Sequence, residues 1–357
     1  MKLRYLFLIL TVTLLACNTV MAPFMTPVPV MVESSSTPPT PPEAATQAAS
    51  PLTPAENSSR AAPFPYGSVA ETLNLDFRVL ETSRGAEAWE RLQAANQFNE
   101  APPAGAEWLL LKVEATNRGN RALEIGLGDF LVTGSLGVAY FGGGAVPPDP
   151  SLDFTLEPGE TGAGYLVYLI QSDDDNLLLL RHRYAGSEEQ MTFLALSPGA
   201  AVQVPSVLSG TPSPLGESRE APAPPGAWVS TDDWNLRVET ALHGADAWRA
   251  LQEADAYNTP PPAGYAYHII RLDVQATHSE ERPRLFLQYL LSCLGSSGKE
   301  YESAVVTLPH PSVETRFFPG AAFSGWTAFL LPEEEGCTLV YRPFADLNGG
   351  PRYLSLP

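Results

Sequence analysis

An internal repeat limits what this chain can fold into. The segment Gly85-Ala86-Glu87-Ala88-Trp89 recurs as Gly244-Ala245-Asp246-Ala247-Trp248, 159 positions later. Further matches follow in the same order: Asn99 with Asn258, Pro102-Pro103 with Pro261-Pro262, Gly105 with Gly264 and, at a spacing of 161, Pro158-Gly159 with Pro319-Gly320. Ordered matches with a nearly constant spacing predict two copies of one unit, which we place at residues 64–197 and 226–357.

Each copy has the hydrophobic pattern of β-strands. In the segment 108–117, Leu109, Leu111, Val113 and Ala115 recur at every second position, the period of a half-buried strand. The second copy repeats this with Ile270, Leu272, Val274 and Ala276. More strands are expected at 123–133, 137–141, 162–170, 177–184 and 191–196, separated by turn residues. No strand–helix–strand alternation is seen. We therefore expect an all-β fold of two tandem antiparallel immunoglobulin-like β-sandwich domains.

One short helix is expected in each copy. Ala86, Trp89 and Leu92 lie three residues apart and would form one stripe on a helix, and Ala245, Trp248 and Leu251 repeat the stripe. Proline clusters follow each segment and prevent the helix from continuing. We expect Trp89 and Trp248 to pack in the core rather than to stack on sugars.

Residues 1–17 read as a lipoprotein signal peptide. Lys2 and Arg4 precede the apolar run 6–15, which is too short to span a bilayer, and Leu14-Leu15-Ala16-Cys17 has the pattern of a lipobox. Cleavage before Cys17 would leave this cysteine to be acylated. Several acyl chains anchor a protein more firmly than one. We expect a chain held in the cell envelope by lipidated Cys17, facing the periplasm or the exterior.

Two proline-rich stretches are predicted linkers. Residues 18–63 combine many Pro, Ala, Ser and Thr with few aromatics, a composition that cannot bury enough apolar surface to fold. Residues 198–225 have a similar composition and separate the two copies. Because proline-rich segments stay extended, the first linker would hold the first domain away from the membrane.

The charge of the chain excludes one class of partner. The formal net charge is -19 at pH 7, without a basic patch that would attract a phosphate backbone. We therefore expect no nucleic-acid partner. The plain interpretation of the acidity is solubility.

Cys293 and Cys337 are the two cysteines that remain after Cys17. An even pair in an extracytoplasmic domain is a disulfide candidate, and two free, buried thiols are the alternative. A bond would connect the strand at 286–294 with the one at 337–342. The first copy has Val132 where the second has Cys293, so only the second copy would be cross-linked.

The sequence contains no recognisable catalytic set or cofactor motif. A nucleophile elbow, a paired-histidine zinc motif, a phosphate loop and an EF-hand loop are all missing, and no two of the five histidines lie at ligand spacing. The run Asp173, Asp174, Asp175 is a weak candidate for Ca²⁺. Consecutive carboxylates on a turn point in different directions, however, so a solvated turn is the preferred interpretation. We predict no catalytic residue, no other metal site and no cofactor.

The order of motifs resembles a known domain family. A strand, a Gly-Ala-x-Ala-Trp helix, Asn99, Pro102-Pro103, Gly105, a strand ending at Asn117 and Pro158-Gly159 are similar to the telokin-like, immunoglobulin-like domains of bacterial lipoproteins, whose function is unknown. The second copy departs from this pattern where His278 to Glu281 replace the turn Asn117 to Asn120. The resemblance implies a sandwich fold and an envelope location, and it transfers no catalytic residue.

These observations lead to a ranked expectation of function. The first is a membrane-tethered, non-catalytic binding or scaffold lipoprotein with a protein partner in the envelope and an unknown ligand. The alternative is a carbohydrate- or Ca²⁺-dependent binding module. A cell-envelope hydrolase with a carboxylate pair is the last choice.

Overall fold

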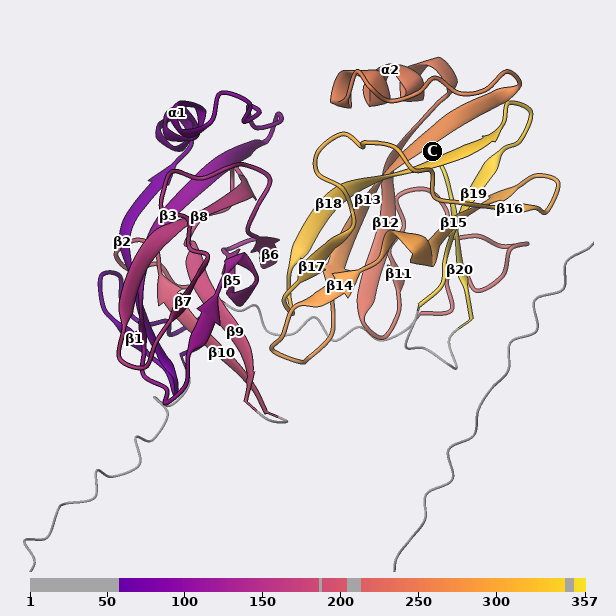
Figure 1. Cartoon of the computed structure of the whole chain (residues 1–357). Coiled ribbons are helices and arrows are strands. Elements are labelled where there is room, and N and C mark those ends of the chain that lie inside the picture. The colour runs from indigo at the N-terminus through magenta and orange to yellow at the C-terminus, as the bar shows by residue number, and fades with distance from the viewer. Residues whose placement is uncertain (1–57, 186–187, 204–212, 344–349) are drawn as a thin grey trace, which may run out of the picture. The chain divides into compact units, whose positions relative to one another are not determined.

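The computed structural model describes residues 58–185, 188–203, 213–343 and 350–357, and nearly all regular structure in them is β-strand. The strands form antiparallel sheets that face each other in two β-sandwiches, as the sequence predicts (Figure 1). The helix α1 (Ala86–Ala95) accompanies the first sandwich and α2 (Gly244–Ala254) the second.

The first sandwich consists of two sheets and a short strand pair. One sheet has the order β1 (Ala70–Glu71), β2 (Leu75–Arg84), β3 (Ala106–Asn117), β8 (Thr161–Gln171). The opposite sheet contains, in order, β10 (Glu188–Ala195), β9 (Leu178–Ala185), β5 (Phe130–Thr133) and β6 (Val138–Phe141). The pair is β4 (Leu123–Ile125) with β7 (Phe154–Leu156).

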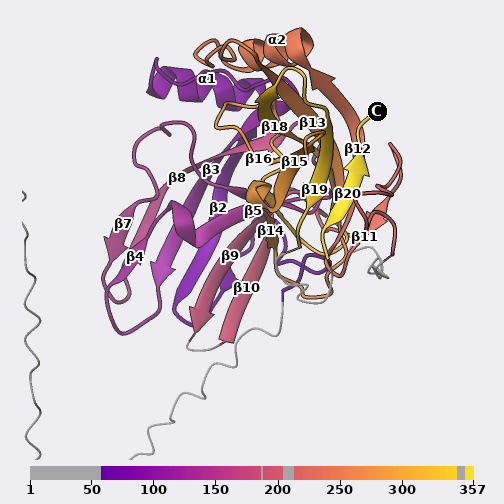
Figure 2. The same ribbon diagram turned by 90° about the vertical axis from the view of Figure 1, so that its right-hand side faces the viewer.

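The second sandwich repeats this plan strand for strand. Most of its strands are labelled in Figure 2. One sheet has the order β11 (Val229–Ser230), β12 (Trp234–His243), β13 (Tyr265–Ala276), β18 (Ala322–Pro332). The other has the order β16 (Glu300–Glu302), β15 (Leu291–Gly295), β19 (Cys337–Tyr341), β20 (Arg352–Ser355). The short pair is β14 (Arg284–Phe286) with β17 (Thr315–Phe317), and β17 also pairs with β6 of the first sandwich.

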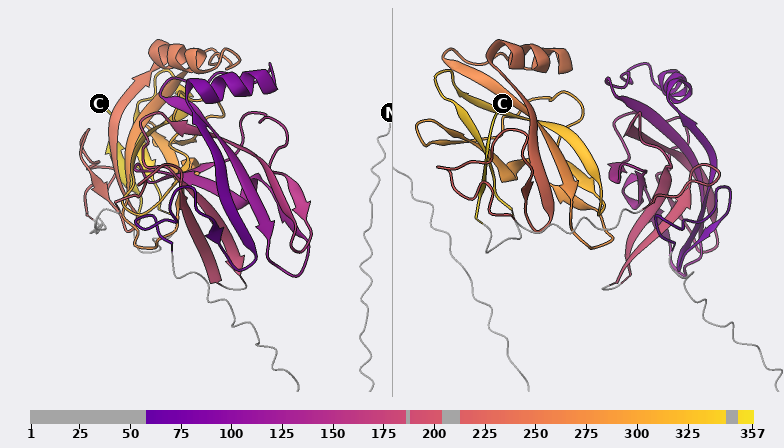
Figure 3. Two further views of the ribbon diagram at one scale, coloured as in Figure 1. Left: turned by 90° about the vertical axis from the view of Figure 1, so that its left-hand side faces the viewer. Right: turned by 180° about the vertical axis from the view of Figure 1, so that it is seen from behind.

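The central strands bury the residues that the alternating pattern selects. Leu109, Leu111, Val113 and Ala115 are fully buried between the sheets. Their neighbours Trp108 and Leu110 are buried as well, because α1 packs on the outer face at this end of the sheet. Figure 3 shows that each helix lies against an end of its own sheet. The prediction of a half-buried strand therefore fails at the end of the strand that the helix covers.

The predicted helical stripe is partly wrong. Ala88 and Leu92 are the buried residues of α1, with Trp89 half-buried, whereas Ala86 is exposed. The two buried residues are four positions apart rather than three. Both spacings place side chains on one face of a helix. α2 behaves in the same way: Ala247 and Leu251 are buried and Ala245 is exposed.

The repeated glycine at the start of each helical segment has a backbone reason. Gly85 and Gly244 have φ angles of 64° and 61°, in the left-handed region that other residues rarely adopt. At this point the chain leaves a long strand and turns into the helix. The repeated motif therefore begins with glycine because the turn requires it.

The segment 123–133 is not one strand. It is divided into β4, a 3₁₀ turn at Leu127–Asp129 and β5. The Asp129 carboxylate accepts a hydrogen bond from the Gly126 backbone N–H at 3.0 Å, which closes the turn. The interruption lets β4 pair with β7 while β5 joins the other sheet.

Ordered packing extends beyond the expected edges of the two repeat units. Arg60, within the predicted first linker, is 1% exposed, donates to the Pro319 carbonyl at 3.2 Å and pairs with Glu281 at 2.8 Å. Its guanidinium lies 4.5 Å from the centre of the Phe318 ring. Val202 and Ala223, in the predicted second linker, are also buried. Specific contacts hold these short ends despite their composition.

The register also corrects the comparison of the two copies. Asn117 pairs with Leu75 and Ala276 with Trp234, so Asn117 corresponds to Ala276 rather than to His278. The sequence of the second copy therefore begins to differ from the motif of the first copy at Ala276, two residues before His278. Within the described ranges, no helix has the length and apolar character that crossing a bilayer requires.

Candidate functional site

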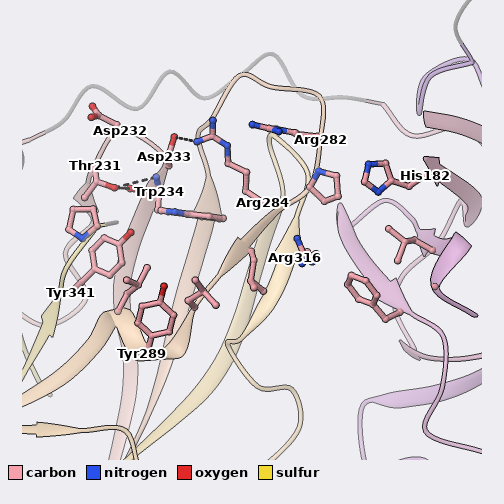
Figure 4. Close-up of a pocket in the computed structure, with 18 residues that line it drawn as sticks. His182, Thr231, Asp232, Asp233, Trp234, Arg282, Arg284, Tyr289, Arg316 and Tyr341 are labelled. Carbon is pink, nitrogen blue, oxygen red and sulfur yellow. Dashed lines mark hydrogen bonds and ion pairs between the residues drawn. The ribbon is translucent and has the colours of Figure 1, made fainter. Parts of the chain in front are cut away.

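A pocket of about 620 Å³ lies beside β14 and β17 and is the best candidate for a binding site (Figure 4). Most of its lining belongs to the second sandwich, from the loop before β12, the segment around β14 and the start of β17. The first sandwich contributes Gly128, Leu131, Phe141 and His182. The pairing of β17 with β6 brings these two groups of residues together.

Trp234 forms the aromatic base of this pocket. It is 5% exposed and contacts Phe286 and Phe317 edge to face, with ring centres 5.3 and 5.7 Å apart. Its backbone is fixed by Thr231, whose hydroxyl donates to the Trp234 carbonyl at 2.9 Å. Such aromatic packing makes the base rigid.

The charged lining of the pocket consists of three arginines, Arg282, Arg284 and Arg316, and two aspartates, Asp232 and Asp233. Arg284 pairs with Asp233 at 2.5 Å and with Glu280 at 3.0 Å, and Figure 4 shows the first of these pairs. Arg282 pairs with Glu280 at 2.5 Å. The guanidinium groups of Arg282 and Arg284 lower the pKa of Glu280 below its ordinary value, and Arg282 contributes most. Its carboxylate therefore stays ionised and partly neutralises these arginines.

Arg316 is in a different position. Its guanidinium lies 5.4 Å from the centre of the Phe141 ring, and it forms no ion pair with any residue of the described ranges. An arginine over an aromatic face keeps its donors available at the edge of the guanidinium plane. This pocket therefore presents one cation without a partner carboxylate next to an apolar rim that includes Leu131 and Leu287.

The polar side chains at the start of the second sandwich already have internal partners. The Thr231 hydroxyl is engaged with the backbone of Trp234, and Asp233 is paired with Arg284. Neither is placed as a nucleophile beside a free base. Guanidinium groups, in contrast, recognise carboxylates through paired hydrogen bonds.

The predicted site residues lie elsewhere. Cys17 is outside the described residues. Cys293 and Cys337 are joined as a disulfide, with Cα atoms 5.4 Å apart, within the usual range. They lie on the neighbouring strands β15 and β19, where Cys293 is opposite Leu339 and Cys337 is opposite Gly295. The bond therefore runs diagonally across one sheet of the second sandwich.

The carboxylates of Asp173, Asp174 and Asp175 do not converge on one point. Asp173 and Asp175 are exposed, whereas Asp174 is fully buried. The Asp174 carboxylate accepts hydrogen bonds from Leu136 N–H at 2.9 Å and from the Tyr140 hydroxyl at 2.8 Å. Burial raises the pKa of Asp174 above its ordinary value, although these bonds act in the opposite direction. Asp174 is thus a structural acceptor that holds the β5–β6 turn.

The acidic run Glu333-Glu334-Glu335 contains the counterpart of Asp174. Glu335 accepts hydrogen bonds from Ser296 Oγ and Ser297 N–H, both at 3.0 Å, and hydrogen bonding by these serines lowers its pKa. Both carboxylates hold equivalent turns. Across the described ranges, no three His, Cys, Asp or Glu side chains are arranged to hold a metal ion.

One pair of histidines was not expected from the sequence. His243 and His268 are 25 positions apart along the chain, yet they are directly opposite each other on β12 and β13, with ring centres 5.1 Å apart. His268 is 6% exposed, and its Nε2 atom has no hydrogen-bond partner among the residues that the structure describes. Burial, together with the neighbouring His243, lowers the pKa of His268 to about 4. No signal in the sequence marked this pair, because the strand pairing that brings the two histidines together was not predicted.

Two pairs of equivalent aromatic residues differ in their exposure to solvent. Trp89 and Trp248 are half-buried, and Trp248 stacks on Tyr267 with ring centres 6.2 Å apart. Phe98 and Tyr257, in contrast, are 81% and 93% exposed on equivalent loops after the two helices. These exposed rings were missed because isolated aromatics in a loop carry no periodic signal.

Comparison with known proteins gives only remote likenesses. No protein-family model matches the chain, and no curated protein matches it. Three solved structures are similar to part of it. The yjhA protein of Bacillus subtilis has 12% identity and a TM-score of 0.26, covering 37% of this chain and 99% of its own. A functionally unknown protein of Listeria monocytogenes has 10% identity and a TM-score of 0.27, covering 38% and 82%. An uncharacterized beta-sandwich protein of Clostridium difficile has 10% identity and a TM-score of 0.24, covering 41% and 100%.

Proposed function

We propose that this chain is a lipid-anchored, extracytoplasmic, non-catalytic binding or scaffold protein. Its two sandwiches are assigned to the immunoglobulin-like, telokin-like class on the repeated motifs. The lipobox pattern at Leu14 to Cys17 supports the anchor, and the long proline-rich segment supports display away from a membrane. Its partner is a protein of the envelope that presents a carboxylate to the pocket.

The observation that carries the binding role is Arg316. A guanidinium that has no partner carboxylate among the described residues, over Phe141 and beside an apolar rim, matches a ligand with a carboxylate attached to an apolar body. The other two arginines have internal partners and set the local charge. A protein side chain or C-terminus that is both acidic and apolar has this chemistry.

A binding experiment tests this role. Acidic and amidated forms of an apolar peptide panel would be titrated against the full chain, with Arg316→Gln as the test variant and Arg78→Gln as the control. Arg78 is an exposed arginine of the first sandwich that pairs with Glu114. We expect the acidic peptides to bind, with at least about a tenfold loss in Arg316→Gln, since a hydrogen bond to a charged group contributes about 1.5–3 kcal/mol. Equal binding by all three proteins would refute the assignment of the pocket.

The non-catalytic role and the anchor need their own measurements. Turnover of any member of a panel of envelope polymers by the purified chain would contradict the binding role. For the anchor, a Cys17→Ala variant is expected to lose fatty-acid labelling and to leave the membrane fraction. Labelling that persists in this variant would refute the lipidation of Cys17.

A second candidate function has its own observation. Phe98 and Tyr257 are exposed rings at equivalent positions, and paired aromatic platforms are a common way to stack on sugar rings. If the chain is a carbohydrate-binding module, a Phe98→Ala, Tyr257→Ala double variant should lose retention on insoluble envelope glycans while Arg316→Gln retains it. The opposite result assigns binding to the pocket.

A further inference from the structure

Two imidazole rings face each other on neighbouring strands of the second sandwich. His243 ends β12 and His268 is directly opposite it on β13. Side chains at directly opposite positions of antiparallel strands project from the same face of the sheet, and here the two imidazole ring centres are 5.1 Å apart. Two imidazoles bound to one tetrahedral ion at about 2.0–2.1 Å would have ring centres roughly 5 Å apart.

His268 has a nitrogen whose burial is otherwise unexplained. The residue is 6% exposed, and its Nε2 atom is buried without a hydrogen-bond partner in the described part of the chain. A buried polar atom that lacks a partner destabilises a fold, and a bound ion is one of the recognised reasons for such an atom.

His243 supplies the open side of this arrangement. It is exposed to solvent, so an ion can reach the pair from outside. It is also the N-cap residue of α2, yet its side chain makes no capping hydrogen bond. Ser, Thr, Asp or Asn would serve that position better, so capping does not account for the histidine.

The first sandwich provides an internal comparison. Its register places Arg84 opposite Leu109 where the second sandwich has His243 opposite His268. Arg84 there pairs with Glu107. The fold therefore does not require two imidazoles at this position, and their joint presence is a property of the second copy alone.

We propose that His243 and His268 bind a divalent late transition-metal ion, with water completing its coordination. Imidazole nitrogens suit Cu²⁺, Ni²⁺ and Zn²⁺, whereas Mg²⁺ and Ca²⁺ require oxygen ligands. Cu²⁺ is expected to bind most tightly, following the general order of affinities for nitrogen sites. Two protein ligands close to the positive end of α2 make an exchangeable site rather than a permanently occupied one.

Metal titration of the full chain tests the proposal. Purified protein in detergent would be titrated with Cu²⁺, with Zn²⁺ and, as a negative control, with Mg²⁺. Isothermal calorimetry would give stoichiometry and affinity, and electron paramagnetic resonance of the Cu²⁺ complex would count nitrogen ligands. The test variants are His243→Gln and His268→Leu, the second of which installs the residue that the first sandwich carries. The control is His310→Gln, which removes a histidine that is bonded to Gln171 instead.

The expected result is one Cu²⁺ per chain with a two-nitrogen spectrum, weaker binding of Zn²⁺ and no binding of Mg²⁺. Each test variant should bind Cu²⁺ at least about tenfold more weakly, and His310→Gln should bind like the natural chain. His268→Leu removes the unpaired nitrogen, so it should fold, and circular dichroism would verify this. Binding that survives in the His243→Gln, His268→Leu double variant, or the absence of Cu²⁺ binding by the natural chain at micromolar concentration, would overturn the proposal. Because no residue of the carboxylate pocket is altered, either result leaves the proposed function to its own test.

Discussion

Asn99 holds Val146 through both hydrogen-bonding atoms of its side-chain amide: Nδ2 donates to the Val146 carbonyl at 2.9 Å, and Oδ1 accepts from the Val146 N–H at 2.8 Å. Nδ2 also donates to the Leu92 carbonyl at the end of α1, at 2.8 Å. Asn258 makes the same three bonds in the second sandwich, to Thr307 and to Leu251. The repeated asparagine therefore fastens the end of each helix to a loop of its own sandwich.

Replacing either asparagine with alanine should destabilise its sandwich. Three hydrogen bonds are lost at each site. Because these bonds are partly exposed, each contributes roughly 0.5–1 kcal/mol, so the free energy of unfolding should fall by about 2 kcal/mol. The free energy of urea unfolding measures this. Asn96→Ala is the control, since Asn96 accepts one exposed bond from Phe98 N–H and should cost under about 0.5 kcal/mol. Equal losses in the control and test variants would show that the three-bond arrangement is not what stabilises this end.

Sequence reasoning found the strands because their periods are local. Leu109, Leu111, Val113 and Ala115 are buried as the alternation requires. The pattern did not mark the point where β12 shifts register between Val238 and Thr240. This one-residue irregularity places His243 opposite His268, whereas an unbroken ladder would place it opposite Tyr267. The candidate metal site therefore depends on a backbone feature that hydrophobic periodicity does not report.

The pocket, too, could not be predicted from the sequence. Its residues come from the start of β12, from the segment around β14, from β17 and from the first sandwich. The pairing of β17 with β6 connects strands of the two copies, and no internal pattern of either copy requires it. The acidic runs, by contrast, are obvious in the sequence. Their residues Asp174 and Glu335, however, accept hydrogen bonds that close turns and do not form a ligand site.

Gly164 and Gly325 should not tolerate alanine. A Cβ at Gly164 would lie 2.5 Å from the Ser151 carbonyl oxygen, and one at Gly325 would lie 2.6 Å from Val313 backbone atoms. In both places a neighbouring segment runs against the strand and bonds to it. Each substitution should therefore cost about 1–3 kcal/mol, the usual range for overpacking. Gly128→Ala is the control, because nothing lies within 4 Å of its Cβ position. Urea unfolding of the three variants measures the difference, and a loss in Gly164→Ala no larger than in the control would contradict it.

Removing the disulfide should weaken the second sandwich selectively. The bond between Cys293 and Cys337 closes a segment with a sequence separation of 44, and loop entropy predicts about 4 kcal/mol, of which about 2–4 kcal/mol is usually realised. The best variant is Cys293→Val with Cys337→Leu, which copies Val132 and Leu177 of the first sandwich. Hydrogen exchange should then accelerate in β15 and β19 but not in β5 and β9. Acceleration in both sandwiches alike, or in neither, would contradict this selectivity.

His278 should make the second sandwich less stable as the pH falls below neutrality. The side chain is 3% exposed, and its two ring nitrogens lie 3.2 Å from the carbonyls of Glu280 and Phe317. Burial lowers its pKa, assisted by Arg284 and opposed by the Phe317 carbonyl and by Asp233. Below a pH of about 6.5 the unfolded chain therefore binds a proton that the folded chain does not. The stabilisation is complete above that pH and is lost as the pH falls toward the folded pKa, at up to about 1.4 kcal/mol per pH unit.

The measurement is urea unfolding at pH 7.5 and 5.5, with a chelator present, for the natural chain and for His278→Gln. Glutamine keeps one donor for the Phe317 carbonyl but cannot titrate. The variant should lose less stability over this pH interval than the natural chain. All other histidines and carboxylates are the same in both proteins, so the difference between the two slopes belongs to His278. Parallel slopes would mean that the folded state accepts the proton as readily as the unfolded chain, in which case burial does not control this imidazole.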